Sequence, residues 1–251
     1  YKRQVCALCE KAPENATKPC IVVPSTLDAV KKIGRAYREK FDIPVIGISG
    51  SVGKTSTKEM LYAVLSQKFK THKTQGNLNN ELGVPLTLLS MPEDTEAAVI
   101  EMGMSHQGEI SRMSMSCQPD VAVITNIGIS HIENLGTQEN ILKAKLEILD
   151  GAAYDAPLIL CRDDKLLAGV QLHSDRKVYY YSVSKKDCDV YASGVKTVDN
   201  SITFTINYEG GKIAAQINCL GEHNVKNALA AFCVCLLYTS PSPRDYAASR
   251  M

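Results

Sequence analysis

Short apolar runs rich in β-branched residues alternate with helical stretches along the first two thirds of the sequence. The apolar runs cover residues 20–23, 45–48, 97–100, 121–125 and 158–161, and the helical patterns cover residues 26–40, 54–68, 81–89 and 137–149. Nearly continuous apolar runs are typical of strands that are buried on both faces of a sheet. Strands that alternate with helices predict βαβ units, so we expect an α/β fold with a mostly parallel sheet flanked by helices.

The pattern changes after about residue 175. Short β-rich runs at residues 178–183, 190–193, 202–208 and 213–218 are separated by turn signals. Closely spaced strands of this kind predict a small antiparallel sheet appended to the α/β part. A last helical pattern begins near Asn224 and continues to residue 235.

The composition narrows the class of protein. The 251 residues carry 28 Lys and Arg against 27 Asp and Glu, a net charge of +1, and 45% of the residues are hydrophobic. This balance supports a folded core and argues against nucleic-acid or membrane binding through bulk charge. The longest uncharged apolar run, residues 228–238, is shorter than the roughly 20 residues of a spanning helix, and no leader pattern opens the chain. The nine cysteines are spaced irregularly, so we expect a cytoplasmic protein with reduced thiols.

The strongest local signal is the segment of residues 43–57, IPVIGISGSVGKTST, in which an apolar strand enters a glycine-rich turn that opens a helix. Glycines let the backbone approach phosphate groups, and successive N–H groups at a helix N-terminus bind the phosphate oxygens. Lys54 would neutralise the β- and γ-phosphates, and the Thr55 hydroxyl can ligate Mg²⁺. The predicted nucleotide-binding residues are Gly50, Ser51, Val52, Gly53, Lys54, Thr55 and Ser56.

Two observations qualify this P-loop prediction. Ile48 stands where the full P-loop pattern has its first glycine, so a plain glycine-rich turn is the alternative. An unrelated P-loop phosphotransferase or a GTPase is a further alternative, although the sequence contains no NKxD motif to read a guanine base.

Polar side chains follow two further predicted strands. Glu101 ends the run at residues 97–100, and His131 lies in the loop after residues 121–125. Open α/β sheets bind ligands at the carboxyl ends of their strands, so Glu101 is placed to hold Mg²⁺. A surface glutamate and a surface histidine are the alternatives. Asn224 and Asn227 could read an adenine edge, although Asn224 could equally cap the last helix.

Helical phase separates two lysines in the segment of residues 137–149. Lys145 shares a stripe with Ile141 and Ile148, whereas Lys143 lies on a stripe with two glutamates. We therefore expect Lys145 on the semi-buried side, where burial favours a neutral amine that can take up CO₂ as a carbamate. Helical phase alone favours the alternative, a lysine whose stem packs on the core while its ammonium reaches water.

Six segments together carry a resemblance to a known family. In chain order they are ISGSVGKTSTKEM, TQGNLNNELGVPLTLL, EMGMSHQGEI, TNIGISHIENLG, KAKLEIL and GEHNVKNALAA. They resemble the ATP-dependent Mur ligases, which build the peptidoglycan stem peptide, and the resemblance runs from about residue 20 to residue 232. It also accounts for Ile48, because this family uses a shortened GxxGKT loop. The sequences of these segments are most similar to those of the family members that add D-Ala-D-Ala to UDP-N-acetylmuramoyl-tripeptide.

The resemblance implies a domain organisation. The family has an N-terminal domain for the UDP-sugar, a central ATP-binding domain, and a C-terminal Rossmann-like domain that closes over the nucleotide. We expect residues 1–42 to be a remnant of the first domain with its linker helix, and residues 43–235 to be the central domain. Residues 236–251 have the appearance of a non-native tail, and the C-terminal domain is expected to be absent. The chain is therefore interpreted as a fragment that is inactive by itself.

The resemblance also implies a mechanism and a set of site residues. ATP would phosphorylate the terminal carboxylate of the UDP-linked tripeptide, and the amine of D-Ala-D-Ala would attack the acyl phosphate. The catalytic residues implied in this way are Lys54, Asn77, His131 and Lys145. The implied ligands of two Mg²⁺ ions are Thr55 and Glu101 for the first, and Glu101, His131 and carbamylated Lys145 for the second. The implied adenine contacts are Asn224 and Asn227, while Asn77 would lie near the γ-phosphate and the acyl group.

Two other classes remain open at this point. The chain could belong to a superfamily member that adds a different amino acid, such as the diaminopimelate- or lysine-adding ligase, or to folylpolyglutamate synthase. It could also be a nucleotide-binding module without ligase activity. For the ligase we expect a bacterial, cytoplasmic monomer that acts in peptidoglycan and cell-wall synthesis, and thereby in cell shape, division and the cell cycle.

Overall fold

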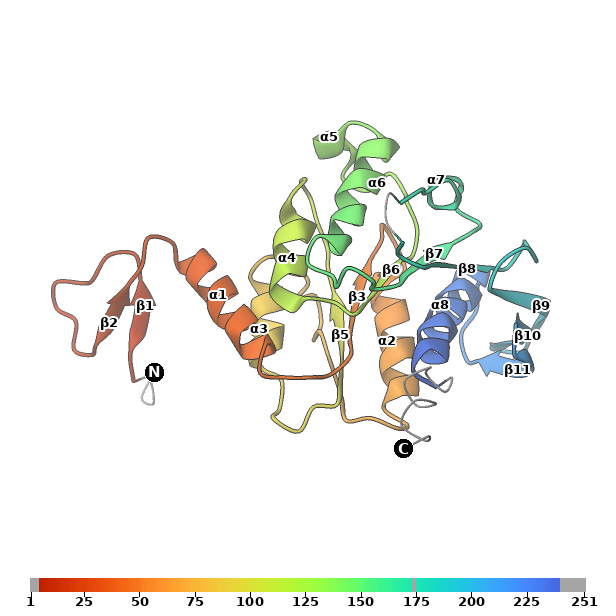
Figure 1. The fold of residues 1–251 in the computed structure, drawn as a ribbon, viewed down its shortest axis with the longest axis horizontal. Helices are drawn as coiled ribbons and strands as arrows, with labels where there is room; N and C mark the ends of the chain where they lie inside the picture. Colours follow the sequence, from red (N-terminus) through yellow and green to blue (C-terminus); the bar gives the residue numbers. More distant parts are fainter. Residues whose placement is uncertain (1–4, 173–174, 240–251) are drawn as a thin grey trace.

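The structure is a computed structural model and describes residues 5–172 and 175–239. These residues form a nine-stranded sheet with helices on both faces and a separate two-stranded sheet near the N-terminus (Figure 1). The strands of the large sheet are β3 (Val45–Ser49), β4 (Thr71–Lys73), β5 (Ala97–Glu101), β6 (Val121–Ile124), β7 (Leu158–Cys161), β8 (Val178–Ser182), β9 (Val190–Val198), β10 (Ser201–Tyr208) and β11 (Gly211–Ile217). Their order across the sheet is β11-β10-β9-β8-β7-β6-β3-β5-β4.

Most of the large sheet is parallel, as the sequence predicted. Every neighbouring pair from β4 to β9 is parallel, whereas β10 pairs antiparallel with both β9 and β11. All residues of β3, β5, β6 and β7 are buried, because helices cover both faces of this part of the sheet. The prediction of an α/β fold with a buried parallel sheet is confirmed.

The antiparallel strands differ from the prediction in one respect. The run at residues 178–183 was expected in an appended antiparallel sheet, but β8 pairs in parallel with β7 on one side and β9 on the other. β8 joins the parallel part because its inward residue Tyr181 is buried in the main core, beneath the last helix. The antiparallel strands therefore continue the central sheet and do not form a separate one.

The helices lie in two layers on the sheet. On one face, α2 (Lys54–Leu65) and α8 (Glu222–Thr239) lie side by side (Figure 1). The other face carries α4 (Glu109–Cys117) and α6 (Gln138–Leu146), with α1 (Thr26–Arg38) and α3 (Gly83–Leu89) beside α4. Shorter elements are α5 (Ile132–Leu135), the 3-10 helix Glu147–Leu149 and α7 (Lys165–Ala168). No helix among the described residues is both long and apolar enough to cross a bilayer.

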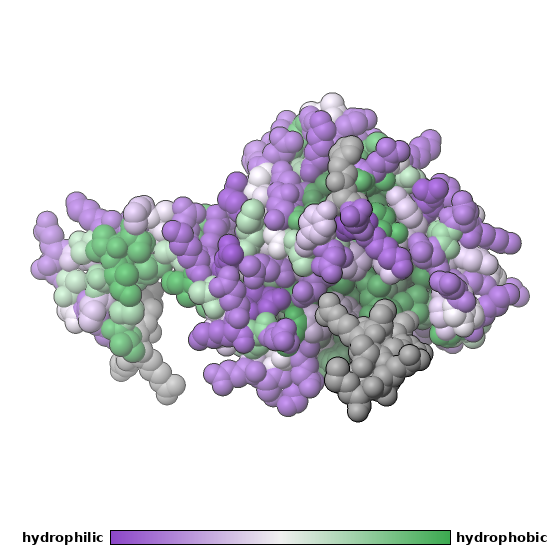
Figure 2. Space-filling model, viewed as in Figure 1, coloured by the Kyte–Doolittle hydropathy of each residue, from purple (hydrophilic) through white to green (hydrophobic). Residues whose placement is uncertain are grey.

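The N-terminal strands form an arm that projects from the body (Figure 1). β1 (Ala7–Cys9) pairs in parallel with β2 (Cys20–Val22), and neither strand joins the large sheet. The prediction that residues 20–23 form a buried strand is wrong, since 53% of Ile21 and 57% of Val22 are exposed. They are exposed because no helix covers this pair of strands, and Figure 2 shows hydrophobic residues gathered on the arm.

The last helix continues beyond the predicted end of the central domain. α8 runs to Thr239, four residues past residue 235. Leu236, Leu237 and Tyr238 continue the helix because they pack, partly buried, against the core. Residues 1–4 and 240–251, which include most of the predicted non-native tail, lie outside the described residues.

The register of the central strands brings three loops together. β3 lies between β5 and β6, with Ile48 opposite Glu101 and Ser49 opposite Ile124. The three strands are parallel, so their carboxyl ends meet at one edge of the sheet. The loops that follow β3, β5 and β6 therefore meet there, which is the usual position of a ligand site in an open α/β sheet.

Candidate active site

The loop between β3 and α2 has the backbone that the two glycines were predicted to allow. Gly50 has φ +148° and Gly53 has φ +82°, in the region that side-chain-bearing residues avoid. A Cβ atom at Gly50 would collide with the Thr125 hydroxyl, and one at Gly53 would lie 2.7 Å from Asn227 Oδ1. Both positions therefore require glycine for two independent reasons, backbone angle and close neighbours.

The loop that follows β6 braces this glycine-rich loop. Asn126 Oδ1 accepts hydrogen bonds from the N–H groups of Ser51 (3.1 Å) and Val52 (2.9 Å). The Thr125 hydroxyl donates to the Val52 carbonyl at 2.6 Å, and the Gly128 N–H donates to the Ser51 hydroxyl at 2.8 Å. Sequence reasoning assigned no role to Asn126, although its place directly after a strand next to β3 was the available signal.

The first turn of α2 is left open to an anion. Gly53 is the N-cap of this helix and provides no side-chain cap, so the first N–H groups lack the usual capping oxygen. Lys54 Nζ instead folds over the loop and donates to the carbonyl groups of Gly50 (2.8 Å) and Ser51 (3.4 Å). Burial lowers the pKa of Lys54, and the negative charge of Glu101 opposes this effect. A helix N-terminus with a lysine above it is a typical phosphate site.

Glu101 ends β5 inside the protein, with only 1% of the residue exposed. Its Oε1 accepts hydrogen bonds from Asn79 Nδ2 (2.7 Å) and from the Thr55 hydroxyl (3.2 Å). Within the described residues its Oε2 is buried without a hydrogen-bond partner, and Lys58 Nζ lies 3.3 Å away as an ion-pair partner. A buried carboxylate next to a threonine hydroxyl offers the hard oxygen ligands that Mg²⁺ prefers, so these residues fit such an ion.

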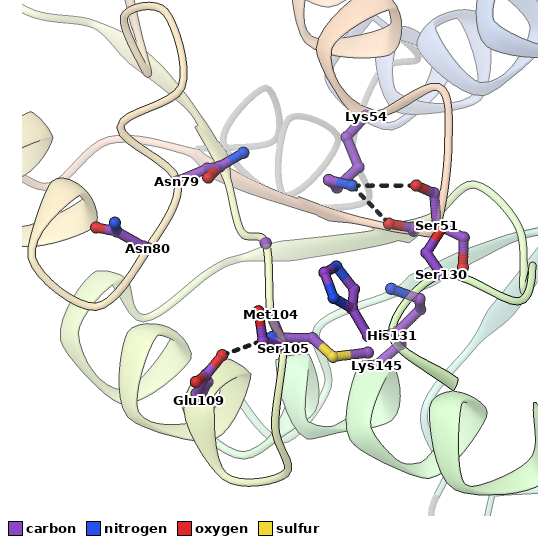
Figure 3. Close-up of a pocket in the computed structure, with 12 residues that line it drawn as sticks. Ser51, Lys54, Asn79, Asn80, Met104, Ser105, Glu109, Ser130, His131 and Lys145 are labelled. Atoms are coloured by element: carbon purple, nitrogen blue, oxygen red, sulfur yellow. Dashed lines mark hydrogen bonds between the residues drawn. The ribbon is translucent and has the colours of Figure 1, made fainter. Parts of the chain in front are cut away.

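A cavity of about 250 Å³ lies between the loops (Figure 3). Its lining residues are Gly50, Ser51, Lys54, Asn79, Asn80, Gly103, Met104, Ser105, Glu109, Ser130, His131 and Lys145. Lys54 and Lys145 approach the cavity from different elements, and His131 lies beside Lys145 (Figure 3). The structure thus brings the predicted residues Lys54, His131 and Lys145 to one cavity.

Lys145 is buried, as its helical phase predicted. Only 3% of Lys145 is exposed, whereas Lys143 on the same helix is exposed. Within the described residues Lys145 Nζ has no hydrogen-bond or ion-pair partner. Burial, and to a lesser extent the positive charge of Lys54, lowers the pKa of Lys145 to about 7. A large share of this side chain is therefore a neutral amine at physiological pH.

One predicted residue, Asn77, lies away from the cavity. Asn77 is exposed and does not line the cavity, whereas Asn79, two residues further on, hydrogen-bonds Glu101. Sequence reasoning missed Asn79, although it lies in the same quoted segment, TQGNLNN. Asn77 is solvent-accessible, so its predicted contact with a γ-phosphate stays a prediction.

The two asparagines of α8 are engaged within the protein. Asn227 is 5% exposed, and its Oδ1 accepts a hydrogen bond from the Thr57 hydroxyl at 3.2 Å. Its Nδ2 donates to Asn224 Oδ1 at 3.3 Å, and Asn224 Nδ2 donates to the Leu220 carbonyl at 2.8 Å. Asn224 lies inside α8 and donates where a capping side chain would accept, so the alternative that it caps the helix is wrong. Their predicted contact with adenine stays a prediction.

Fold and site together define an α/β domain with a glycine-rich loop of the P-loop type between β3 and α2. The family model described as the Mur ligase middle domain matches residues 48–235, and the chain belongs to this family.

Curated relatives support the same assignment. A UDP-N-acetylmuramoyl-tripeptide–D-alanyl-D-alanine ligase of Bacillus subtilis is 44% identical over 219 residues, which are 87% of this chain and 46% of the relative. The enzyme of the same name from Escherichia coli is 34% identical over 226 residues, 90% of this chain and 50% of the relative. This chain thus spans about half the length of the curated relatives that it matches.

Solved structures agree on the fold. A crystal structure of MurF from Acinetobacter baumannii has a TM-score of 0.86 at 34% identity and covers 95% of this chain and 52% of its own. MurF ligase from Thermotoga maritima in complex with ADP has a TM-score of 0.85 at 28% identity, covering 93% of this chain and 54% of its own. A diaminopimelate ligase structure has a TM-score of 0.68 at only 18% identity, which shows a shared fold and nothing more.

Proposed function

We propose that this chain is the ATP-binding part of a ligase that joins D-Ala-D-Ala to UDP-N-acetylmuramoyl-tripeptide through an acyl phosphate. The observation that carries the proposal is the cavity where the Lys54 loop, His131 and Lys145 meet, beside the buried Glu101. The relatives named for this reaction, at 34–44% identity, support the choice of substrates. The protein of Thermotoga maritima named MurF ligase has ADP in its structure, which supports a nucleotide at this loop.

Lys54 would have two roles at the start of the reaction. Its ammonium would leave the Gly50 and Ser51 carbonyls and contact the phosphates, while the first N–H groups of α2 hold their oxygens. Charge then builds on the transferred phosphoryl group, and a fixed ammonium there lowers the barrier. Thr55 and Glu101 would hold one Mg²⁺, which supplies further compensation of phosphate charge when it is bound.

Lys145 suits a carbamate that would complete a second Mg²⁺ site. A neutral amine attacks CO₂ and releases one proton, which converts a cation into an anionic oxygen group. Its pKa of about 7 and its lack of a partner among the described residues both support this reaction. The proposed second set of ligands is Glu101, His131 and carbamylated Lys145, of which His131 and Lys145 line the same cavity.

The acyl transfer needs the tripeptide carboxylate near the γ-phosphate. The cavity between Lys54 and Lys145 would admit that carboxylate, and Asn77 would approach from the exposed side of its loop. The amine of D-Ala-D-Ala would attack the acyl carbon, and the tetrahedral intermediate would expel phosphate. Asn224 and Asn227 would contact the adenine after exchanging at least one of their present hydrogen bonds.

The second candidate is a superfamily member that adds a different amino acid. The fold alone permits it, because the diaminopimelate ligase shares this fold. The relatives named for D-Ala-D-Ala addition are much more similar in sequence, and this difference favours the first candidate. For the proposed ligase we place the reaction in peptidoglycan synthesis in the bacterial cytoplasm, with consequences for cell shape and division, and we propose that it acts as a monomer.

Binding of nucleotide to the 251-residue chain tests the first half of the proposal. Calorimetric titration with Mg-ADP should give measurable but weak binding, and Lys54→Ala should weaken it by at least about tenfold, because a charge-assisted contact to phosphate is lost. Lys143→Ala, which removes an exposed lysine, is the matched control and should bind as the unchanged chain does. Equal affinity of all three proteins would contradict the proposed phosphate site.

Substrate choice requires a longer protein. Residues 43–235 can replace the matching segment of the Bacillus subtilis relative, and release of ADP by this chimera can be measured. We expect release that depends on both UDP-tripeptide and D-Ala-D-Ala, and none from the 251-residue chain with the same substrates. A chimera that turns over only with the UDP-linked L-alanyl-D-glutamate and diaminopimelate would support the second candidate instead.

A further inference from the structure

Lys58 is a buried lysine that no step of the proposed reaction uses. It lies on α2 one turn after Lys54, and only 1% of it is exposed. Its Nζ lies 3.3 Å from Glu101 Oε2, 3.5 Å from Glu59 Oε1 and 3.3 Å from the Gly76 carbonyl oxygen, to which it donates. A buried ammonium is strongly destabilising unless charge and hydrogen bonds compensate it. The three oxygens supply that compensation and fix the ammonium against Glu101.

Lys58 faces the carboxylate that is proposed to bind Mg²⁺. Glu101 Oε1 is engaged by Asn79 and Thr55, so Oε2 is the oxygen that remains, and Lys58 is its ion-pair partner. An ammonium at this distance neutralises the carboxylate and repels a metal ion that approaches it. No group of three or more His, Cys, Asp or Glu side chains in the described part of the chain is placed to hold a metal. While Lys145 is uncarbamylated, the protein alone thus offers a divalent cation one carboxylate whose charge is already compensated.

We propose that Lys58 masks the charge of Glu101, so that the site binds a divalent cation only when a nucleotide contributes its phosphates. The inference rests on the proposed function, since it takes the phosphates to bind at the loop of Lys54. Mg²⁺ sites of this kind combine one or two carboxylates with substrate phosphates. With Lys58 present and Lys145 uncarbamylated, the negative charge that outweighs the masking ammonium must come from the phosphates. Lys58 acts through Glu101 and touches no substrate, so it is a positioning residue.

Metal binding without turnover tests this proposal. Mn²⁺ serves as the probe, and electron paramagnetic resonance of free Mn²⁺ in CO₂-free buffer gives its affinity for the 251-residue chain with and without ADP. The unchanged chain should bind Mn²⁺ weakly alone and much more tightly with ADP. Lys58→Met should bind Mn²⁺ alone on the order of tenfold more tightly, because a repelling unit charge is removed. Its gain in affinity on adding ADP should shrink by a similar factor.

Three further variants separate charge from structure. Lys58→Arg keeps a cation and should behave as the unchanged chain, whereas Lys58→Gln keeps a donor for Gly76 without charge and should behave as Lys58→Met. The double variant Lys58→Met/Glu101→Gln removes both charges, so no uncompensated carboxylate stays buried. It should lose the gain in Mn²⁺ affinity that Lys58→Met shows without ADP.

Mn²⁺ affinity that is unchanged or weaker in both Lys58→Met and Lys58→Gln would overturn the masking role, because a lysine that only supports the structure would weaken binding. If ADP leaves the Mn²⁺ affinity of the unchanged chain unaltered, the proposed nucleotide site fails. The comparison of Lys58 variants without ADP still decides the role of Lys58 in that case.

Discussion

Two lysines of one cavity are held in opposite ways. Lys54 donates to two backbone carbonyls and lies near the charge of Glu101, whereas Lys145 is buried without a partner among the described residues. The first lysine keeps compensating contacts for its cation, and the second loses them. In the proposed reaction, the same residue type would supply a phosphate-binding cation on one side of the cavity and a nucleophilic amine on the other.

The buried amine has a consequence for stability. The pKa of Lys145 is about 7 in the folded chain and near 10.5 in the unfolded chain. Between these values the unfolded state binds more protons, so this residue makes stability rise as pH increases from 7 towards 10. In CO₂-free buffer, Lys145→Met should be more stable than the unchanged chain by about 2–4 kcal/mol below pH 7, with the difference shrinking towards pH 10.

Urea unfolding at pH 6 and pH 9.5 measures this difference. Lys143→Met on the same helix removes an exposed lysine and should leave the pH dependence of the unchanged chain intact. Identical pH dependence of the unchanged chain and Lys145→Met would mean that the amine is charged in the folded state, and the carbamate proposal would lose its support.

The environment of a single residue was predictable from the sequence where helical periodicity or a backbone angle determines it. The helical phase of Lys145 and the positive φ of Gly50 and Gly53 follow from short-range chemistry. No role was predicted for Asn126 or Lys58, because their partners lie on other elements that only the strand order brings together. The separation of Asn77 from the cavity is likewise set by the path of a loop, which spacing along the sequence does not determine.

At the scale of elements, α8 is the part whose end was misplaced. The switch to Ser and Pro suggested an end at residue 235, but the apolar side chains of the next three residues still meet the core. The strand β4 and the helix α4 were not predicted, because β4 has only three residues and α4 is rich in Ser and Met. Elements with strong periodicity were predicted from the sequence. Short or weakly patterned elements could be identified only from the structure, because tertiary contacts determine them.

Truncation tests how much the last turn of α8 contributes. A chain that ends after Thr239 should be as stable as the 251-residue chain. A chain that ends after Cys235 should lose about 1–4 kcal/mol, because it removes partly buried Leu and Tyr side chains from the core. The free energy of unfolding in urea gives both values. Equal stability of the two shorter chains would show that the last turn of α8 contributes nothing to the fold.

The whole molecule consists of a large body and a small N-terminal arm. β1 and β2 pair only with each other, and a two-stranded sheet alone is marginally stable in water. The fold class was predictable because the alternation of buried strands and helices admits few arrangements. The exposure of β2 was not predictable, since an apolar run looks the same whether or not a second layer covers it.

Removal of the arm tests its independence from the body. A chain that begins at Ser25 keeps the N-cap of α1, whose hydroxyl accepts from the Asp28 N–H at 3.2 Å. We expect its unfolding free energy to lie within about 0.5 kcal/mol of the unchanged chain, and its ADP affinity to be the same. The lost contacts include the hydrogen bonds from Thr26 to Glu10 at the surface. A large loss of stability or of ADP binding would mean that the arm supports the body.

The position of Lys54 determines what can enter the loop. Its ammonium already donates hydrogen bonds to the Gly50 and Ser51 carbonyls. A ligand that contacts this ammonium must therefore replace those two hydrogen bonds. A phosphate replaces two weak dipolar partners with a full negative charge, and the exchange is favourable. A neutral group must also displace the ammonium from both carbonyls, but it offers the ammonium no negative charge. In the proposed nucleotide site, Lys54 would therefore favour anionic over neutral ligands, and uncharged competitors of the nucleotide should gain affinity only from surfaces outside this loop.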